Sequence, residues 1–310
     1  MACLSLLLMA LLALLSTALG GHDFTVRVDT EAPPTHRVNS LFFGCHSDSG
    51  FTHQVRSFAS QMIFGESFEA PQPNASRGVS ADAWSFASNC NATSTVETAT
   101  VAPAMHGASS RRIAVHAPAP SGSATEALLR NRGLGNEGLY FEGGKPYEGF
   151  FFARCDPSQA PVKLLARLAT HDRVVLAQTH YDFKCGATSA DWVRLNFSMV
   201  PAREAACVGI PVGSDPHVHC TNPTSEAGHA CVRCAGEFQL GLASVGSVAF
   251  DYVVLQPGVW GRVGDLPVKR STADALLQMG ITAIRVGGSF ASVTVWPDGG
   301  GGACPGNPSR

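Results

Sequence analysis

The sequence has no long run of lysine or arginine, and its charges nearly cancel. Twenty-two basic residues stand against 24 acidic ones, which gives a formal net charge of -2 at pH 7. Binding to nucleic acid or to an anionic membrane depends on an electrostatic attraction that this composition does not supply. A neutral partner such as a sugar is compatible with it, and no nucleic acid partner is expected.

Charge is absent altogether from residues 1–20, MACLSLLLMALLALLSTALG. The stretch is leucine-rich and ends in the small residues Ala18 and Gly20, where a signal peptidase would cut. A membrane anchor is the alternative, but the stretch is short for a span of about 20 apolar residues and no basic flank follows it. We therefore expect a cleaved signal peptide at 1–20 and a secreted, extracellular protein with no membrane association afterwards.

Cysteine, in contrast, is plentiful. Ten are present, and loss of the signal peptide with Cys3 leaves nine: Cys45, Cys90, Cys155, Cys185, Cys207, Cys220, Cys231, Cys234 and Cys304. In an oxidising compartment most should pair, and the odd number leaves one thiol free, bridged to another chain, or paired outside this sequence. Glycosylation sequons at Asn74, Asn91 and Asn196 fit the same secreted setting.

The segment after the signal, residues 21–69, predicts two strands and a helix. DFTVRVD (23–29) alternates apolar and polar residues, and HRVNSLFFG (36–44) ends at a glycine. QVRSFASQMIFGESFE (54–69) spaces its apolar residues at helical intervals. We expect this segment to contain the first strand of a barrel.

Residues 70–123 are rich in Ala, Ser, Thr, Pro and Asn and show no sustained apolar period. Such a composition predicts a long irregular insert. WSFAS (84–88) and RRIAVHA (111–117) are candidate strands within it.

Residues 124–257 predict an all-β module. Seven short apolar or alternating runs are separated by Gly, Pro or Asp turns: GLYFEGG, YEGFFFARC, VKLLARLAT, RVVLAQTHYDF, WVRLNFSMV, GEFQLGLAS and VAFDYVVLQP. Runs at this spacing are typical of a β-sandwich. We expect a jelly roll of the carbohydrate-binding-module kind.

The period changes in residues 258–310. TADALLQMG (272–280) is helical in pattern, with Ser271 as N-cap and Gly280 at the C-cap, and ITAIRVGG (281–288) is a buried strand that runs into a glycine turn. One β/α unit begins here, and no internal repeat at periods of about 20 to 50 residues suggests a solenoid instead. The predicted fold class is thus α/β plus all-β: an incomplete (β/α)8 TIM-barrel start with an inserted β-sandwich.

Several motifs carry a family resemblance. LFFGCHSDSG (41–50) followed by MIFGESFE (62–69) is similar to the opening of glycoside hydrolase family 51 enzymes. LLRNRGLGNEGLYFEGGKPYEGFFFAR (128–154) looks like the sandwich inserted after the first barrel strand in plant-type and algal members.

The C-terminal motifs continue the resemblance. FDYVVLQPGVWGR (250–262) and DALLQMGITAIRVGGSF (274–290) resemble the return into the barrel, and WPDG (296–299) matches the next loop. The sequence therefore resembles the N-terminal portion of an α-L-arabinofuranosidase.

That resemblance implies retaining hydrolysis of terminal α-L-arabinofuranosyl groups in arabinan or arabinoxylan-type polysaccharides. One glutamate would act as acid/base and a second as nucleophile, about 5 Å apart. In the family both lie on later barrel strands, so we expect both beyond Arg310 and assign no catalytic residue. The 310-residue chain alone should then be inactive. The chemistry needs no cofactor, and none is expected.

The resemblance also implies substrate-binding roles for Asp48, Gly287, Gly288, Ser289 and Trp296. Asp48 stands where the family usually has a glutamate that binds sugar hydroxyls, and it fits an ordinary turn carboxylate equally well. Ser289 replaces the usual asparagine or cysteine. The indole of Trp296 suits the C–H face of a sugar ring.

Other candidates favour structural readings. Glu137, Glu142 and Glu148 could supply a pair of carboxylates for glycoside cleavage, but they lie in the turn-rich β module. Asp251 fits an ordinary carboxylate at a strand edge. Arg285 fits a buried arginine that braces the end of the barrel through hydrogen bonds. Six aromatic residues could form a sugar-binding platform, although alternating strand aromatics more often pack a core. They are Tyr140, Phe141, Tyr147, Phe150, Phe151 and Phe152.

The segment HVHCTNPTSEAGHACVRC (217–234) offers several imidazoles and thiols to zinc. Its spacing lacks the second half of a common zinc motif, and an oxidising compartment favours disulfides over metal. A C-x-x-C redox pair is disfavoured because no βαβ unit precedes it. No metal is expected.

Three functions stay open at this point. The first is an arabinofuranosidase, whose partner is a polysaccharide or oligosaccharide with α-L-arabinofuranosyl groups. The second is a non-catalytic secreted module that binds glycans. The third is a cysteine-rich interaction protein unrelated to sugars.

Overall fold

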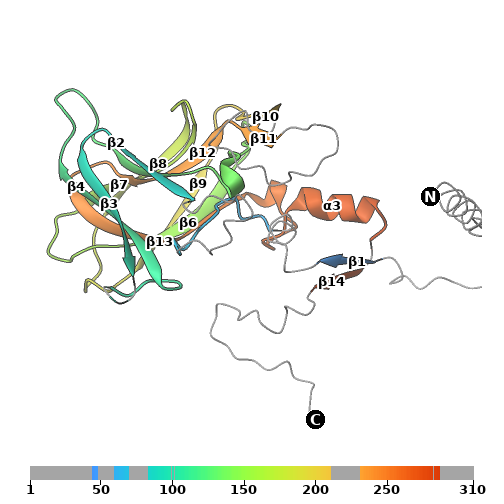
Figure 1. The fold of residues 1–310 in the computed structure, drawn as a ribbon, viewed down its shortest axis with the longest axis horizontal. Coiled ribbons are helices and arrows are strands. Elements are labelled where there is room, and N and C mark those ends of the chain that lie inside the picture. The colour runs from blue at the N-terminus through green and yellow to red at the C-terminus, as the bar shows by residue number, and fades with distance from the viewer. Residues whose placement is uncertain are drawn as a thin grey trace, which may run out of the picture. The chain divides into compact units, whose positions relative to one another are not determined.

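The computed structural model describes residues 44–47, 59–69, 83–98, 100, 102–210, 231–281 and 283–286. The chain divides into two units, Met1–Phe42 and Phe43–Arg310, and every described residue belongs to the second. Strands dominate this described part (Figure 1).

Two five-stranded antiparallel sheets form the main body. The first has the order β2-β5-β12-β7-β8, with the bounds Trp84–Ser88, Ala127–Asn131, Gly236–Leu242, Val162–Thr170 and Val175–Phe183. The second has the order β3-β4-β13-β6-β9, with the bounds Asn91–Thr98, Ser109–Ala117, Gly246–Pro257, Tyr147–Arg154 and Val193–Met199. The chain passes repeatedly from one sheet to the other, which gives a β-sandwich. Its finer description as a jelly roll stays a prediction.

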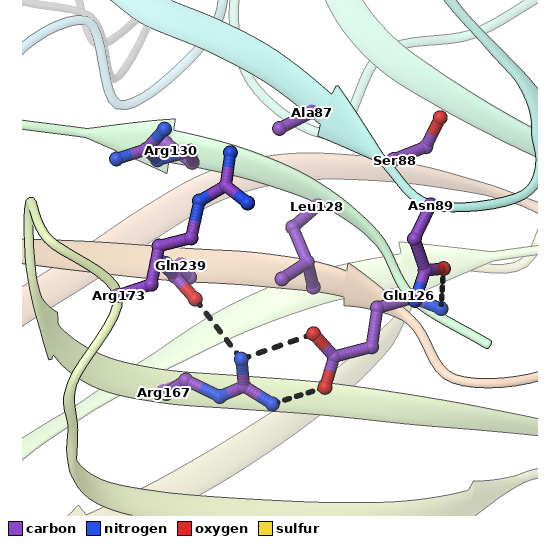
Figure 2. A pocket seen from close by; sticks show the side chains of 9 residues that line it. All are labelled: Ala87, Ser88, Asn89, Glu126, Leu128, Arg130, Arg167, Arg173 and Gln239. Atoms are coloured by element: carbon purple, nitrogen blue, oxygen red, sulfur yellow. Dashed lines mark hydrogen bonds and ion pairs between the residues drawn. The ribbon is translucent and has the colours of Figure 1, made fainter. Parts of the chain in front are cut away.

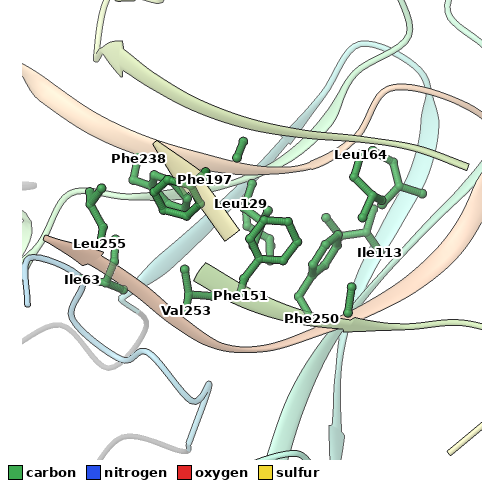
Figure 3. Close-up of a cluster of buried hydrophobic side chains, with 14 of the residues drawn as sticks. Ile63, Ile113, Leu129, Phe151, Leu164, Phe197, Phe238, Phe250, Val253 and Leu255 are labelled. Atoms are coloured by element: carbon green, nitrogen blue, oxygen red, sulfur yellow. The ribbon is translucent and has the colours of Figure 1, made fainter. Parts of the chain in front are cut away.

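One apolar core lies between the two sheets (Figure 3). Phe238 of β12 enters it from the first sheet, and Phe151 of β6 and Phe250 of β13 enter it from the second. The ring of Phe197 in β9 lies 5.5 Å from that of Phe238, so side chains of the two sheets meet directly. Each strand can supply this core because alternate side chains point to the same face.

Three sandwich strands fall inside residues 70–123, where the sequence predicts an irregular insert. β2 and β4 coincide with the two candidate strands, and β3 had no sequence signal. The reason is that β3, NATSTVET, is an edge strand whose side chains are all exposed or half-exposed, so it has no apolar period to detect. The sandwich begins at Trp84, well before residue 124.

The helix predicted over 54–69 is not found in its described part, residues 59–69. This segment hydrogen-bonds with β13: Met62 N–H donates to Leu255 C=O at 2.8 Å, and Val253 N–H donates to Glu66 C=O at 2.9 Å. Ile63 is fully buried in the core. The helical spacing was misleading because a neighbouring strand offers the backbone better partners than a short isolated helix does.

Six of the seven apolar runs form strands, namely β6, β7, β8, β9, β12 and β13. The remaining run, GLYFEGG, makes only isolated bridges, from Leu139 to Gly236 and from Phe141 to Ala205. At Gly138, φ is 92° and an added Cβ would lie 1.9 Å from the carbonyl oxygen of Cys234. This backbone crosses another chain segment too closely for any residue but glycine.

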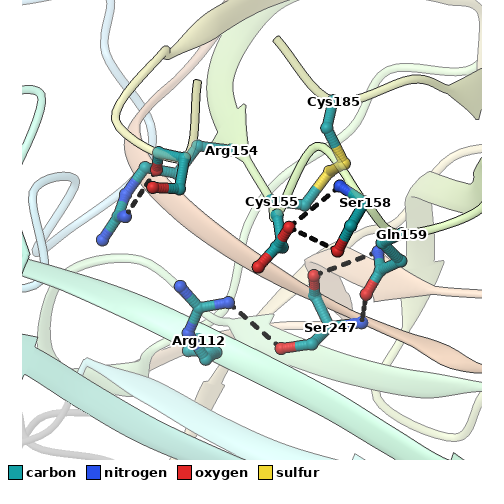
Figure 4. The surroundings of a disulfide bond; sticks show 9 residues. Arg112, Arg154, Cys155, Ser158, Gln159, Cys185 and Ser247 are labelled. Carbon is teal, nitrogen blue, oxygen red and sulfur yellow. Dashed lines mark hydrogen bonds between the residues drawn. A yellow bond between two sulfur atoms is a disulfide. The ribbon is translucent and has the colours of Figure 1, made fainter. Parts of the chain in front are cut away.

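Two disulfides cross-link the described chain. Cys155–Cys185 joins the end of β6 to the segment after β8 (Figure 4), and Cys207–Cys234 joins β10 (Cys207–Ile210) to β11 (Cys231–Cys234). Beside the first disulfide, Gln159 Oε1 accepts a hydrogen bond from Ser247 N–H at 2.8 Å. Among the cysteines whose side chains are described, only Cys90 is unpaired. Disulfides agree with an oxidising compartment.

A short parallel pair lies outside the sandwich in sequence: β1 (Gly44–Ser47) pairs with β14 (Ala283–Val286). The helix α3 (Arg270–Gln278) precedes β14, as in a β/α unit, whereas a barrel stays a prediction. The predicted N-cap at Ser271 is wrong: Lys269 holds the N-cap position, without a side-chain hydrogen bond, and the helix begins two residues earlier than predicted. Gly280, with φ of 72°, follows the C-cap Met279.

Two short 3-10 turns complete the described elements, η2 (Leu134–Asn136) and η3 (Val259–Gly261). None of the helices in the described part of the chain combines the length and the apolar character needed to cross a membrane.

Candidate functional site

A cleft with a volume of about 230 Å³ opens on the first sheet (Figure 2). Strands β2, β5, β7 and β12 and the segments beside them supply its walls. The lining residues are Ala87, Ser88, Asn89, Glu126, Leu128, Arg130, Arg167, Arg173 and Gln239.

The polar character of the cleft follows from strand alternation. In β5, Leu129 packs in the core, while Leu128 and Arg130 line the cleft. In β12, Phe238 packs in the core, while Gln239 lines the cleft. The cleft therefore lies on the face of the sheet that points away from the core.

Arg130 and Glu237 form a two-pronged ion pair at the base of the cleft. Arg130 Nε donates to Glu237 Oε1 at 2.8 Å, and Arg130 Nη2 donates to Oε2 at 2.7 Å. The Glu237 side chain is fully buried, and Gln239 Nε2 also donates to it. A buried carboxylate needs such donors, because its desolvation is otherwise uncompensated.

Arg167 and Glu126 form a second two-pronged pair. Arg167 Nη1 donates to Glu126 Oε2 at 3.1 Å, and Nη2 donates to the other carboxylate oxygen. Arg167 Nη1 also donates to Gln239 Oε1 at 3.3 Å, and Nε donates to Gln178 Oε1 at 3.2 Å. Gln239 thus joins both pairs into one network, which fixes the orientation of the side chains at the base of the cleft.

Asn89, at the rim of the cleft, holds the segment before β5 in place. Its Nδ2 donates to Ala124 C=O at 2.7 Å, and its Oδ1 accepts from Glu126 N–H at 2.9 Å. The segment that carries Glu126 into β5 is therefore tied to the end of β2.

Arg173 comes from the turn between β7 and β8, and its side chain extends over the cleft (Figure 2). Its backbone has a positive φ of 71°, which is uncommon for a residue other than glycine. The turn is held by bonds from Arg173 N–H to Thr170 C=O at 2.8 Å and from Val174 N–H to Thr170 Oγ1 at 3.1 Å.

None of the described residues that line the cleft is aromatic. The predicted aromatic platform is divided: Tyr140 is exposed, Phe141, Tyr147 and Phe151 are buried in the core, and Phe150 and Phe152 are half-buried. The last two lie on the opposite face of the second sheet.

On that outer face, the rings of Phe150 and Tyr252 lie 5.9 Å apart, and the guanidinium of Arg194 lies 3.8 Å from the Phe150 ring centre. The arginine covers this ring in a cation–π contact. These aromatic side chains are thus partly engaged with one another and with arginine.

Asp251, beside these aromatics, is fully buried at an irregularity of β13. Its Oδ2 accepts from Met105 N–H at 2.7 Å and from His106 N–H at 3.0 Å, and its Oδ1 accepts from Tyr252 N–H at 2.7 Å. Burial raises the pKa of Asp251 to about 6, although these backbone amides act in the opposite direction. Its role is structural, since it holds the segment before β4 against the bulge, but the predicted strand-edge position is wrong because β13 is the central strand of its sheet and Asp251 is buried.

Asp251 predicts a pH effect on stability. Because its folded pKa lies above the ordinary value of 3.8, the native state binds more protons than the unfolded state between about pH 4 and 6. The contribution of Asp251 to the free energy of unfolding is therefore full below about pH 4 and is lost as the pH rises through 6, a change of about 3 kcal/mol. Urea unfolding of the native chain and of Asp251→Asn at pH 4, 5 and 7 tests this. The difference in free energy of unfolding between the two chains should change with pH by this amount. A difference that stays constant across this range would contradict the prediction.

The predicted substrate-binding residues Asp48, Gly287, Gly288, Ser289 and Trp296 lie outside the described residues. Their roles stay predictions. The structure consequently neither brings them together nor separates them.

Among the sequons, Asn91 at the start of β3 and Asn196 in β9 are exposed, while Asn74 lies outside the described residues. Exposure is a requirement for glycosylation, which itself stays a prediction. Glu148, one of the conceivable catalytic carboxylates, forms an ion pair with Arg262.

Most of the possible zinc segment also lies outside the described residues, and Cys234 at its end is in a disulfide. Within the described chain, no group of three or more His, Cys, Asp or Glu side chains is arranged to hold a metal. The side chain of Arg285 is likewise not described.

Sequence reasoning did not identify the cleft. The available signal was a charged or amide residue inside otherwise apolar strands: Arg130 in ALLRN, Arg167 in VKLLARLAT, and Glu237 and Gln239 in GEFQLGL. A buried strand with a charge in its middle needs a partner on the next strand. That pairing links residues 107 apart in the sequence, so no local motif reveals it.

Comparison with known proteins shows a likeness of fold. No family model and no curated protein matches the chain. An arabinose-bound GH51 α-L-arabinofuranosidase, MgGH51, superposes with a TM-score of 0.57 over 81% of this chain at 19% identity. The alignment covers 35% of that enzyme, so the chain spans about a third of its length. At this identity the likeness shows a glycoside-hydrolase-like fold and nothing finer.

Two more remote likenesses involve carbohydrate-binding modules. A CBM4 module matches 63% of this chain and 99% of its own, at 13% identity and a TM-score of 0.34. The CBM22-1–GH10 modules of Clostridium thermocellum xylanase 10B, in complex with xylohexaose, match 65% of this chain and 29% of their own, at 11% identity and a TM-score of 0.35.

Proposed function

We propose that the β-sandwich is a glycan-binding module of a secreted glycoside hydrolase of the α-L-arabinofuranosidase kind, and that the cleft on its first sheet is the binding site. The observation that carries this proposal is the closed network of Arg130, Glu237, Gln239, Arg167 and Glu126 at the base of the cleft. Polar side chains held rigidly in a concave site are what sugar hydroxyls require.

The chemistry of the cleft suits binding. Guanidinium groups and amides donate and accept several hydrogen bonds in fixed directions, and Leu128 adds an apolar surface for the C–H groups of a sugar ring. Glu126 and Glu237 are both engaged by arginine, so the described residues of the cleft do not offer the two free carboxylates that retaining hydrolysis uses.

For the whole enzyme, we propose retaining hydrolysis of terminal α-L-arabinofuranosyl groups by a member of glycoside hydrolase family 51, plant or algal type. The likeness to the arabinose-bound enzyme supports the class, and the two disulfides support secretion. The catalytic glutamates are proposed to lie on barrel strands outside this sequence.

Calorimetric titration of the 310-residue chain with arabinan and arabinoxylan oligosaccharides tests the proposal. We expect binding, which Ala87→Trp should weaken at least about tenfold because the indole fills the cleft. Thr95→Trp, an exposed position on edge strand β3 of the other sheet, is the matched control and should bind normally. No release of nitrophenol from a nitrophenyl α-L-arabinofuranoside is expected. Failure to bind any glycan, or equal binding by both variants, would overturn the proposal.

A further inference from the structure

We infer that the cleft selects glycans with an acidic sugar unit, and that Arg173 pairs with the carboxylate of a uronic acid. This inference rests on the proposed glycan-binding function and names its ligand class. Four features of the cleft support it: its charge count, the place of Arg173, the free Nη1 of Arg130 and the lack of aromatic side chains among the described residues that line it.

The cleft contains one more arginine than it has carboxylates to neutralise. Arg130 is neutralised by Glu237 and Arg167 by Glu126, each through two hydrogen bonds. Arg173 has no side-chain hydrogen bond or ion pair recorded within the described chain. The whole protein carries a net charge of -2, so this positive charge is a local property of the cleft.

The position of Arg173 is fixed by its turn. The positive φ of 71° costs roughly 1 kcal/mol at a residue other than glycine, and such conformations concentrate at functional sites. Two hydrogen bonds to Thr170 hold the turn in this shape. The exposed side chain is thus carried over the cleft from a fixed base.

Arg130 supplies a second group to the same ligand. Glu237 accepts from its Nε and Nη2, and Nη2 also donates to His171 C=O at 3.3 Å. Among the described residues, Nη1 has no acceptor, although Arg130 lines the cleft. A carboxylate is planar, and its two oxygens match the fork of guanidinium donors. A uronate carboxylate between Arg173 and Arg130 would meet donors from both.

The lack of an aromatic surface among the described residues of the cleft also favours a charged ligand. A neutral sugar ring is commonly held on an aromatic face, and no described residue that lines the cleft provides one. Specific binding there comes mainly from hydrogen bonds, which are strongest when one partner is charged.

Titration of the full chain with trigalacturonic acid and with its methyl ester tests the inference, since the two ligands differ only in their charged groups. At low salt, we expect the acid to bind at least about tenfold more tightly than the ester. Arg173→Gln should reduce this ratio to below about twofold, whereas Arg194→Gln, which removes an exposed arginine on the second sheet, should leave it unchanged.

Equal binding of acid and ester by the native chain would overturn the inference while the glycan-binding function stands. Preference for a sulfated trisaccharide over trigalacturonate would overturn it too, and so would an equal loss in both arginine variants, because that loss reflects net charge alone. Absence of binding to these ligands and to every neutral oligosaccharide would overturn the proposed function as well.

Discussion

Replacing Phe151 by alanine should lower the free energy of unfolding by about 4 kcal/mol, the largest stability effect that we expect from a single substitution in this chain. Phe151 is fully buried, and its ring centre lies 5.6 Å from Tyr181, 6.0 Å from Phe250 and 6.5 Å from Phe197. These residues come from both sheets. Removal of the ring leaves a cavity that two rigid sheets cannot close.

Urea unfolding, followed by tryptophan fluorescence, measures this loss as a lower midpoint at an unchanged slope. The matched control is Phe150→Ala, one residue earlier in β6. Phe150 is half-buried on the outer face, so its loss should be about 1 kcal/mol. If Phe150→Ala proves as costly as Phe151→Ala, the alternation assigned to β6 is wrong.

Replacing Arg130 by alanine should cost about 3 kcal/mol or more, because it leaves the fully buried carboxylate of Glu237 without its cation. Among the described residues, Gln239 is the remaining side-chain donor to this carboxylate, and an amide does not compensate a buried charge. Glycan binding should be lost in the same variant, since the base of the cleft is no longer held together.

A double-mutant cycle separates the interaction energy of Arg130 with Glu237 from the effect of removing either side chain alone. Arg130→Leu combined with Glu237→Leu removes both charges, and we expect this double variant to be more stable than Arg130→Leu alone. Unfolding of the native chain, the two single variants and the double variant at pH 7 completes the cycle. If Arg130→Leu lowers the free energy of unfolding by less than about 1 kcal/mol, water reaches Glu237 and the hydrogen-bond network at the base of the cleft is solvated.

The fold was predictable where strands bury one face or both. β7 and β12 hold apolar residues at alternate positions or throughout, so their type and position follow from the sequence. β3 was missed because nothing along it is buried. The segment at 59–69 was misassigned because its hydrogen-bond partners lie on β13, close to 190 residues later, and helical spacing carries no information about them.

The candidate site was less predictable than the fold. The cleft requires Arg130 to lie beside Glu237, and Arg167 to lie beside Glu126, and both adjacencies depend on the strand order β5-β12-β7. That order follows from long-range pairing, which one sequence does not reveal. The residues carried over from the family resemblance, such as Asp48 and Trp296, concern a different site and stay predictions.

The chain enters and leaves the sandwich through two segments whose backbones lie next to each other. Ala59 and Val268 form an antiparallel bridge, and Ser60 N–H donates to Pro267 C=O at 3.0 Å. The parallel strands β1 and β14 lie on either side of this junction in the sequence. Once the sandwich has folded, only residues 48–58 and 269–282 separate the junction from the two strands. The entropy of closing β1 on β14 is then that of a loop of about 25 residues, although more than two hundred residues of chain lie between them.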